Sequence, residues 1–258
     1  MTSAAPLLEA VNLDIVIGDR CLCRQLNWRV MAGESWAVLG RNGAGKTTLL
    51  TSLAGLRRPA AGNILVGGRP IGSLPLRDLA LLRGYLPQQS HDPFASTVLE
   101  TVLVGRHPHL GRWDWESRAD SRIAADALAQ VGLAGFAERD VQTLSGGERQ
   151  RLGVALLLAQ QPSLFLLDEP LAHLDLNHQV ALMELLVRQA QAGAATIAVL
   201  HDPGFAARYC RNALLLFGDG DWLAGPARDI ISAENLSRLY GHPLLRIDTG
   251  SQAVFVPQ

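Results

Sequence analysis

The residue with the clearest chemical meaning is a solitary lysine. Lys and Arg together number 23 in the 258-residue chain, and Lys46 is the only lysine among them. It lies in the segment Gly40-Arg41-Asn42-Gly43-Ala44-Gly45-Lys46-Thr47, which fits the phosphate-binding pattern G-x-x-x-x-G-K-[ST]. A lysine ammonium is a compact charge, whereas the planar guanidinium of arginine does not fit between two phosphates in a tight backbone loop. The segment therefore predicts a site for the phosphates of a nucleotide.

The flanks of this segment are suited to holding it in place. Its three glycines let the backbone turn so that successive N–H groups face inward and form an anion-binding nest. The apolar run 35–39 predicts a short buried strand before the loop, and 47–56 predicts a helix after it. The N-terminal dipole of that helix also favours phosphate. Thr47 would then place its hydroxyl on Mg2+.

A second segment whose residues could take part in catalysis begins about 120 residues after the first. The apolar run 164–167 is followed by Asp168, Glu169 and Pro170, and it predicts a buried parallel strand that ends at the proline. Ligands of open α/β sheets bind beyond the carboxyl ends of the strands. Asp168 would therefore emerge beside the phosphate loop near the metal, and Glu169 beside the attacking water. Taken alone, a strand followed by an acidic turn is common.

A third segment predicts a second phosphate-binding helix start. Ser145 is a candidate N-cap for a helix that continues to Ala159, and Gly146 and Gly147 expose backbone donors at its beginning. One nucleotide in one subunit rarely needs two such sites, so the second indicates a nucleotide held by another copy. Taken alone, Ser-Gly-Gly-Glu is a weak signal, because many helices start in this way.

These segments make the chain similar to the ABC-type ATPases, the nucleotide-binding subunits of ATP-binding-cassette transporters. The resemblance covers essentially all 258 residues. Three further motifs follow in the order and spacing of the family: Gln88 after Tyr85-Leu86-Pro87, Leu174-Asp175 after the acidic strand, and His201 after the apolar run 196–200.

The resemblance implies a single α/β domain over residues 1–258. Its fold would be a P-loop NTPase core with an N-terminal antiparallel β part and an inserted α-helical subdomain. The core would comprise about 1–87 and 161–258, and the helical subdomain about 88–160. Within these parts we expect Thr97 to cap a helix over 98–104 and an amphipathic helix over 117–133. Near the C-terminus we expect a small hairpin around 221–224, a helix over 232–240 and a closing strand.

The resemblance also implies ATP and Mg2+ as cofactors. Glu169 would be the general base, and His201 would hold the γ-phosphate and orient the attack with Gln88 beside it. The other roles would be shared: Gly40, Asn42, Gly43, Ala44, Gly45, Lys46, Thr47 and Thr48 would hold the nucleotide; Thr47, Gln88 and Asp168 would hold the metal; Ser145, Gly146 and Gly147 would grip the nucleotide of the opposite copy; and Asp175 would act across the dimer interface. Two ATP molecules would join two copies head to tail.

One departure from the family pattern concerns the base. The family usually stacks adenine on an aromatic side chain near the start of the second strand, and by spacing this position is Ile17. The range 13–24 contains no aromatic residue. Aliphatic packing would replace ring stacking, and we expect weaker discrimination among bases.

Composition narrows the choice of partners. The formal net charge of −1 and the pI near 6.7 argue against a protein that coats nucleic acid. Apolar runs stay below the roughly 18 residues that span a bilayer, and residues 1–8 lack the pattern of a secretory signal. The three cysteines form neither a pairable framework nor a zinc set. We therefore expect a cytoplasmic protein that is peripheral to any membrane. The resemblance implies that it lies on the cytoplasmic face of the inner membrane, with a second copy, integral permease subunits and, indirectly, a substrate-binding protein as partners.

The range 105–116 holds two histidines and two carboxylates and so raises the question of a metal site. Pro108 separates His107 from His109 and breaks the regular geometry of a preformed pair, and no cysteine lies nearby. The aromatic and arginine content favours a surface that contacts a partner protein. In importers of the family, this region lies near the groove that receives a cytoplasmic helix of the permease.

Details of the sequence are most similar to importer ATPases of the cobalamin and iron-siderophore group. The supporting segments are 105–109, 173–179 and 205–210, and 85–89 with 93–95 leans toward cobalamin. The expected function is ATP hydrolysis that powers import of an iron-siderophore, cobalamin or similar metal chelate. An exporter ATPase would more often be fused to membrane helices. A soluble ATPase of DNA repair or translation would need a coiled-coil insertion, a second cassette or a basic surface, and a small-molecule kinase would lack the helix that starts at Ser145.

Overall fold

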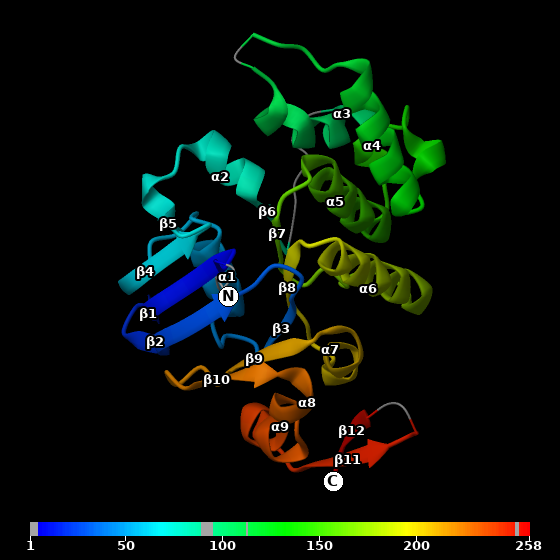
Figure 1. Cartoon of the computed structure of the whole chain (residues 1–258). Coiled ribbons are helices and arrows are strands. Elements are labelled where there is room, and N and C mark those ends of the chain that lie inside the picture. Colours follow the sequence, from blue (N-terminus) through cyan, green and yellow to red (C-terminus); the bar gives the residue numbers. More distant parts are fainter. Residues whose placement is uncertain (1–4, 89–94, 112, 251–252) are drawn as a thin grey trace.

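Two large β-sheets and a group of helices form the molecule (Figure 1). The structure is a computed structural model that describes residues 5–88, 95–111, 113–250 and 253–258. Gln89, Pro93, Phe94 and Arg112, which contribute to the sequence interpretation above, lie outside the described residues. The overall arrangement confirms the mixed α/β fold class.

An antiparallel sheet occupies the N-terminal part, in the order β2-β1-β4-β5. Its long strands are β1 (Leu8–Ile17) and β2 (Arg20–Val30), with β4 (Ala61–Val66) and β5 (Arg69–Pro70) beside them. Alternate residues of β1 are buried, because one face of the sheet covers the core and the other faces solvent. This sheet is the antiparallel part that the resemblance implied.

The second sheet has the order β10-β9-β3-β8-β7-β6 and positions the candidate site. Neighbouring strands run parallel except for the antiparallel pair β9 and β10. Its strands are β3 (Ser35–Gly40), β6 (Arg83–Leu86), β7 (Leu164–Leu167), β8 (Ala195–Val199), β9 (Asn212–Leu216) and β10 (Trp222–Pro226). Every residue of β3, β7, β8 and β9 is buried, as expected for a sheet covered on both faces.

Helices lie in the segments between the strands and cover this sheet. The α-helices are α1 (Lys46–Leu53), α2 (Leu76–Leu82), α3 (Val98–Leu103), α4 (Arg118–Gln130), α5 (Gly146–Gln160), α6 (Leu176–Gln191), α7 (Pro203–Tyr209), α8 (Ala227–Ile230) and α9 (Ala233–Tyr240). Short 3-10 turns are η1 (Ile71–Ser73), η2 (Val104–His109), η3 (Ala134–Phe136) and η4 (Val141–Thr143). A two-stranded hairpin, β11 (Leu244–Asp248) with β12 (Ala253–Pro257), ends the chain.

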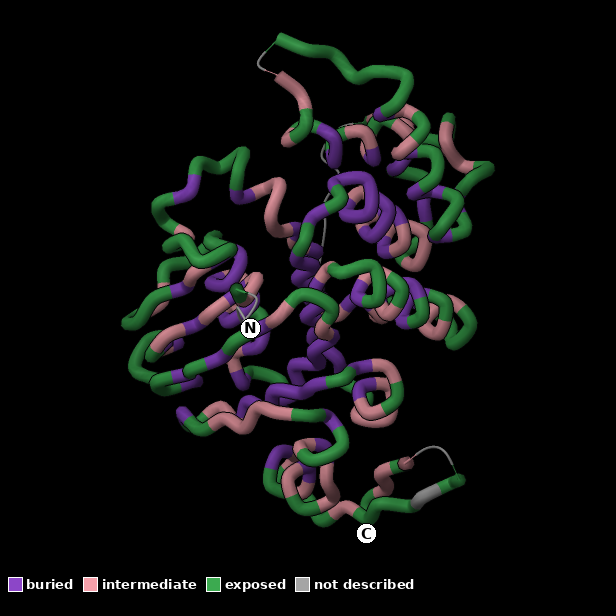
Figure 2. Tube along the Cα trace, viewed as in Figure 1, coloured by how far each residue is buried: buried purple, intermediate pink, exposed green. Residues whose placement is uncertain are grey.

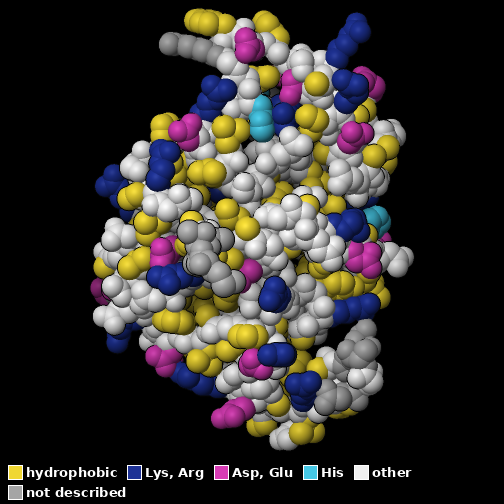
Figure 3. Space-filling view, viewed as in Figure 1, with side chains coloured by type: hydrophobic (Ala, Val, Ile, Leu, Met, Phe, Trp, Pro, Cys, Tyr) yellow, Lys and Arg dark blue, Asp and Glu magenta, His cyan; other side chains and the backbone are white. Residues whose placement is uncertain are grey.

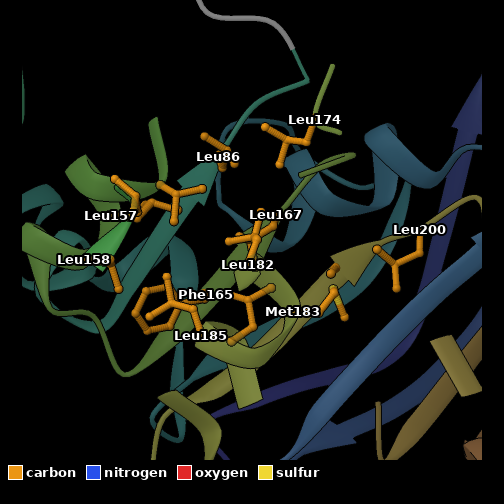
Figure 4. Packing of buried hydrophobic residues seen from close by; sticks show 14 of the residues in the cluster. Leu86, Leu157, Leu158, Phe165, Leu167, Leu174, Leu182, Met183, Leu185 and Leu200 are labelled. Carbon is orange, nitrogen blue, oxygen red and sulfur yellow. The ribbon is translucent and has the colours of Figure 1, made fainter. Parts of the chain in front are cut away.

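The core consists of two apolar clusters, one on each face of the six-stranded sheet. Because successive strand residues point to opposite faces, Phe165 and Leu167 enter one cluster, and Leu164 and Leu166 enter the other. The first cluster includes side chains of α5 and α6 (Figure 4), and the second includes side chains of α1 and the antiparallel sheet. Burial is therefore densest in the middle of the molecule (Figure 2).

The predicted helix starts are confirmed in three places. Thr97, Ser117 and Ser145 each cap a helix, and each forms a reciprocal capping box with the acidic residue three positions later. The helix after the phosphate loop is shorter than predicted and ends at Leu53, since Gly55 adopts a φ of +73°.

The prediction for the C-terminal region was partly wrong. The predicted hairpin around 221–224 is confirmed, because β10 pairs antiparallel with the preceding strand β9, and it adds an edge strand to the main sheet. The predicted closing strand is instead a separate hairpin of β11 and β12. The predicted helix over 232–240 is confirmed as α9, with Ser232 as its N-cap.

Candidate active site

The candidate site lies at one edge of the six-stranded sheet. The phosphate loop follows β3, Gln88 follows β6, Asp168 and Glu169 follow β7, and His201 follows β8. These four strands are parallel neighbours in the order β3-β8-β7-β6, so their carboxyl ends meet at the same edge. The sheet thereby gathers residues that are up to 160 positions apart in the sequence.

Two glycines of the phosphate loop are required by close packing. A Cβ atom on Gly40 would lie 2.8 Å from the carbonyl oxygen of Leu216, and one on Gly45 would lie 2.8 Å from Cδ1 of Leu22. Gly45 also has a φ of +93° and precedes α1 without any side-chain cap. The first N–H groups of α1 therefore have no side-chain acceptor and can bind an anion.

Lys46 is buried at the start of α1, with only 6% of its surface exposed. Its Nζ donates hydrogen bonds to the carbonyl oxygens of Gly40 (2.9 Å) and Arg41 (3.1 Å). Burial lowers the pKa of the ammonium, while the nearby carboxylates Glu169 and Asp168 oppose that shift. The loop thus holds a compact cation that can redirect its donors toward phosphate oxygens.

Asp168 is fully buried, and neither of its carboxylate oxygens has a hydrogen-bond partner among the described residues. Burial raises its pKa, and the adjacent Thr47 hydroxyl and Lys46 ammonium partly offset the rise. A buried carboxylate with free lone pairs beside a hydroxyl is a suitable ligand set for Mg2+, which usually binds one or two carboxylates together with substrate phosphates. No group of three or more His, Cys, Asp or Glu side chains able to hold a metal occurs among the residues the structure describes.

Glu169 contacts the other two residues for which the sequence implied catalytic roles, Gln88 and His201. Nε2 of Gln88 donates to Oε2 of Glu169 at 3.0 Å, and Nε2 of His201 lies 2.8 Å from Oε1. The Glu169 backbone has a φ of +52°, unusual for a residue with a side chain. Each carboxylate oxygen thus has one partner and keeps a further lone pair that can accept a hydrogen bond from a water molecule.

Gln150 is a contact residue of this site that sequence reasoning missed. It lies on α5, is 8% exposed, and its Nε2 donates to the backbone carbonyl of Glu169 at 3.3 Å. The only local cue is its position one helical turn after Gly146. The contact connects α5 directly to the turn that carries Glu169.

The second predicted phosphate site is organised around the start of α5. Ser145 Oγ accepts from the backbone N–H of Glu148 at 3.3 Å, and the Glu148 carboxylate accepts from the Ser145 N–H at 2.7 Å. A Cβ atom on Gly147 would lie 2.9 Å from the carbonyl oxygen of His173. The backbone of Gly146 and Gly147 therefore packs against the 173–175 turn. The principal neighbours of α5 are α3, α4, η2 and β6, whereas those of α1 are β1 and β3.

Asp175 lies at the start of α6, next to the Gly147 contact. Its carboxylate accepts from the backbone N–H of His178 at 2.9 Å and lies 2.8 Å from Nδ1 of the same histidine. The hydrogen bond from the His178 N–H lowers the pKa of Asp175. The side chain is 65% exposed and therefore accessible from outside the chain.

Three other residues singled out in the sequence, Ile17, His107 and His109, take no part in these contacts. Ile17 ends β1 and is exposed. In η2, His109 contacts the carbonyl oxygen of Gln160 at 2.9 Å, whereas His107 lies 3.8 Å from Glu116. The two histidines thus have different partners.

Comparisons with known proteins agree with this geometry. Residues 23–172 match the model of the ABC transporter family. The hemin import ATP-binding protein HmuV of Gloeobacter violaceus is 42% identical over 87% of this chain and 83% of its own length. The petrobactin import ATP-binding protein FpuD of Bacillus anthracis is 37% identical over 87% of this chain and 82% of its own length.

A solved structure extends the likeness to nearly the whole chain. A metal-chelate type ABC transporter in an inward-facing conformation matches with a TM-score of 0.85 and 32% identity, over 98% of both chains. In the described ranges, none of the helices is long and apolar enough to cross a membrane. The chain therefore belongs to the ABC transporter family, as a nucleotide-binding subunit that hydrolyses ATP.

Proposed function

We propose that this protein powers an ABC importer for hemin, an iron-siderophore or a similar metal chelate. The observation that carries the ATPase part is the gathering of Lys46, Asp168 and Glu169 at one sheet edge, with both oxygens of Asp168 unpartnered. The importer part is supported by relatives named for hemin and petrobactin import and by the likeness to a metal-chelate transporter. Cobalamin is an alternative cargo, and the alternative function is that of an ATPase subunit of an ABC exporter or a soluble ABC-type ATPase.

The residues divide the chemistry of phosphoryl transfer among them. The loop backbone, Lys46 and Thr48 would bind the phosphates, and Thr47, Gln88 and Asp168 would hold Mg2+, which neutralises charge on the phosphate oxygens when bound. Glu169 would take a proton from the attacking water as general base. His201 would hold the γ-phosphate, and positioning with charge stabilisation would supply most of the rate enhancement.

Assembly would complete the site. Ser145, Gly146 and Gly147 of one copy would bind the γ-phosphate held by its partner, and the exposed Asp175 would contact the partner subunit. The core 1–87 and 161–258 would bind the nucleotide, and the helical subdomain 88–160 would meet the permease. The complex would lie on the cytoplasmic face of the inner membrane and receive cargo from a substrate-binding protein.

Purification and transport test the importer assignment. We expect the chain to copurify with an integral membrane permease and, in proteoliposomes, to drive ATP-dependent uptake of a metal chelate. Parallel assays with hemin, a ferric siderophore and cobalamin identify the cargo. Failure to associate with any membrane partner, or activity only in export, would contradict the proposal.

Glu169→Gln is expected to retain ATP binding and abolish steady-state hydrolysis. The substitution keeps the side-chain shape but removes the base, so hydrolysis should fall by about 100-fold or more. Phosphate release and nucleotide binding measured in parallel separate the two effects. The matched control Glu184→Gln changes an exposed carboxylate of α6 and should leave both unchanged. Near-normal turnover in Glu169→Gln would show that another group is the base.

A further inference from the structure

A cavity of about 540 Å3 lies between α7, the start of α6, α8 and the C-terminal hairpin. Figure 3 shows a notch between this hairpin and the body of the molecule, with Lys or Arg side chains close to it. The volume is in the range of pockets that enclose small molecules, roughly 300–1,000 Å3. Its lining includes none of the phosphate-loop residues, Asp168, Glu169 or the start of α5.

The walls of this cavity are largely apolar. Phe205 and Tyr209, one helical turn apart on α7, stack with ring centroids 5.7 Å apart and an interplanar angle of 26°. Ile231 from the end of α8 and Val254 and Phe255 from β12 complete this part of the lining. Such walls favour a ligand with a flat or extended apolar body.

The charges around the cavity have predominantly one sign. Arg208, Arg228 and Arg246 line it, and Asp202 is the one carboxylate among the lining residues; outside the lining, Asp229 Oδ1 lies 3.5 Å from Arg228 Nε. Asp202 is occupied in capping α7, where Oδ1 accepts from the N–H groups of Gly204 (2.6 Å) and Phe205 (3.3 Å). Guanidinium groups bind carboxylates and phosphates through paired donors, so a lining that includes Arg208 and Arg228 favours an anion.

The cavity is also connected to the hydrolysis centre. His201 contacts Glu169, and Asp202, the next residue, begins the turn into α7. On the other side, the Tyr240 hydroxyl donates a long hydrogen bond of 3.5 Å to the His201 carbonyl oxygen, and α9, which carries Tyr240, packs against β11. A movement of α7 would therefore be passed to the His201 backbone through Asp202. A movement of the hairpin would be passed to it through α9 and the Tyr240 side chain.

We propose that this cavity binds a small amphipathic anion, an apolar molecule that carries a carboxylate or a similar group, and that its occupancy changes the rate of ATP hydrolysis. The binding step stands on the cavity alone. The regulatory step rests on the proposed function, since it acts through the role of His201.

A matched pair of fluorescent probes tests the chemistry of the ligand. Pyrenebutyrate has an aromatic body with a carboxylate, and pyrenebutanol has the same body without the charge. We expect the acid to bind at least about tenfold more tightly than the alcohol, because only the acid gains charge-assisted hydrogen bonds from arginine. Equal affinities would show non-specific adsorption to apolar surface and would overturn the proposal.

Substitutions then locate the site. Ala207→Trp should fill the cavity and abolish pyrenebutyrate binding, whereas Ala125→Trp, on the exposed face of α4, should not. The double variant Arg208→Gln with Arg228→Gln should weaken binding of the acid but not of the alcohol, and Arg122→Gln on α4 is its control. Undiminished binding of the acid to Ala207→Trp would place the probe elsewhere. If Ala207→Trp instead prevented ATP-dependent dimerisation, the occupant would be a second copy.

Hydrolysis assays test the regulatory step separately. Saturating pyrenebutyrate should change the ATPase rate of the unmodified protein by about threefold or more, in either direction, and leave Ala207→Trp unaffected. Binding without any change in rate would overturn the regulatory step alone. A protein that hydrolyses no ATP under any condition would contradict the proposed function, while the probe affinities would still decide the ligand site.

Discussion

At the scale of single residues, the active site is a place where the folded chain tolerates unfavourable burial. Asp168 is fully buried without a hydrogen-bond partner among the described residues, and Lys46 is almost fully buried beside it. Desolvation raises the pKa of the carboxyl and lowers that of the ammonium, so each group would be easier to accommodate uncharged. Such an arrangement is costly for the empty protein and suited to a ligand that carries both a cation and phosphates.

Asp168→Asn is therefore expected to stabilise the nucleotide-free protein while abolishing hydrolysis. The folded-state pKa of Asp168 is raised, so its ionised form opposes folding at neutral pH, and this opposition fades as the pH falls through the raised pKa toward the ordinary value of 3.8. Removing the charge should increase the free energy of unfolding by about 1–3 kcal/mol at neutral pH. Thermal unfolding without nucleotide measures this gain, and Mg2+-dependent ATP binding measures the loss of function. A variant less stable than the parent protein would show that Asp168 has a partner that satisfies it.

Lys46→Arg tests why the chain uses a single lysine. Lys46 Nζ reaches two loop carbonyls at 2.9 and 3.1 Å inside a buried turn, and a guanidinium is too broad and too differently directed to take the same place. We expect nucleotide affinity or turnover to fall by about 100-fold or more, although the charge is kept. A filter-binding assay and a phosphate-release assay measure the two quantities. Retention of both would show that charge alone suffices at this position.

The sequence predicted most of these residues but not how they contact one another. Lys46, Asp168 and Glu169 stand in short motifs whose chemistry can be recognised locally. The engagement of both Glu169 oxygens by Gln88 and His201 depends on the order of β6, β7 and β8 in the sheet, which no local pattern contains. The Gln150 contact depends on how α5 packs against its neighbours α3, α4, η2 and β6, and for the same reason it was missed.

At the scale of elements, α5 joins several parts of the molecule. Near its start, Gln150 donates to the Glu169 backbone. At its other end, Arg106 Nη1 donates to the Ala159 carbonyl at 2.7 Å, and Gln160 Nε2 donates to the carbonyls of Ala80 and Arg83. This helix therefore connects the turn that carries Glu169 to η2 and α2.

The buried ion pair between η2 and α4 gives a prediction about how stability depends on pH. Arg106 Nε donates to Asp120 Oδ1 at 2.9 Å, with side-chain exposures of 7% and 11%. Hydrogen bonds from Ser117, together with Arg106, lower the pKa of Asp120 from 3.8 to about 2. Because the folded-state pKa is the lower one, this carboxylate contributes stability that is fully present above about pH 4 and is lost as the pH falls toward 2.

Asp120→Asn should therefore destabilise the protein by about 3 kcal/mol at pH 6, because it leaves the buried Arg106 guanidinium without its opposite charge. Its difference from the unmodified protein should shrink as the pH is lowered from 4 to 2. Urea unfolding at several pH values measures both effects. The control Asp229→Asn removes an exposed partner of Arg228 and should change stability by no more than about 1 kcal/mol. A pH-independent difference would assign the loss to packing rather than to charge.

Elements were predicted well where the sequence marks their ends. Capping residues predicted the starts of α3 and α5, an amphipathic stretch predicted α4, and continuous apolar runs predicted β3 and β7. The C-terminal hairpin was missed because its strands are half-exposed, as shown by Leu245 and Ile247 at 47% each, so burial leaves no strong alternation in the sequence. Its pairing of β11 with β12 is set by contacts between strands rather than by local preference.

At the scale of the whole molecule, the two helix starts for which phosphate binding is proposed, those of α1 and α5, lie on different parts of the fold. The start of α1 belongs to the β1 and β3 side, whereas α5 packs with α3, α4 and β6. Near the start of α5, Gly147 lies against the turn that leads to the exposed Asp175. A second copy placed head to tail would bring the α5 start of each chain to the phosphate loop of the other.

Ser145→Arg tests that arrangement. The substitution puts a bulky cation at the start of α5 and removes its cap, while the same chain's phosphate loop is unchanged. We expect ATP to bind with near-normal affinity, whereas hydrolysis and ATP-driven dimerisation fail. Light scattering with and without ATP follows the dimer, and circular dichroism reports whether α5 survives. Ser117→Arg, at the capping box of α4, is a matched control that should lose a cap without affecting dimerisation.

Mixing two defective chains distinguishes action within a chain from action between chains. A dimer of Ser145→Arg with Lys46→Ala contains one composite site that carries both defects and one that carries neither. Recovered activity in the mixture, absent from each variant alone, would require that Ser145 serve the nucleotide of the other copy. Alternating hydrolysis at the two sites could suppress this recovery, so nucleotide-dependent heterodimer formation is the decisive measurement. A Ser145→Arg protein that dimerised and hydrolysed ATP normally would show that the start of α5 has only a structural role.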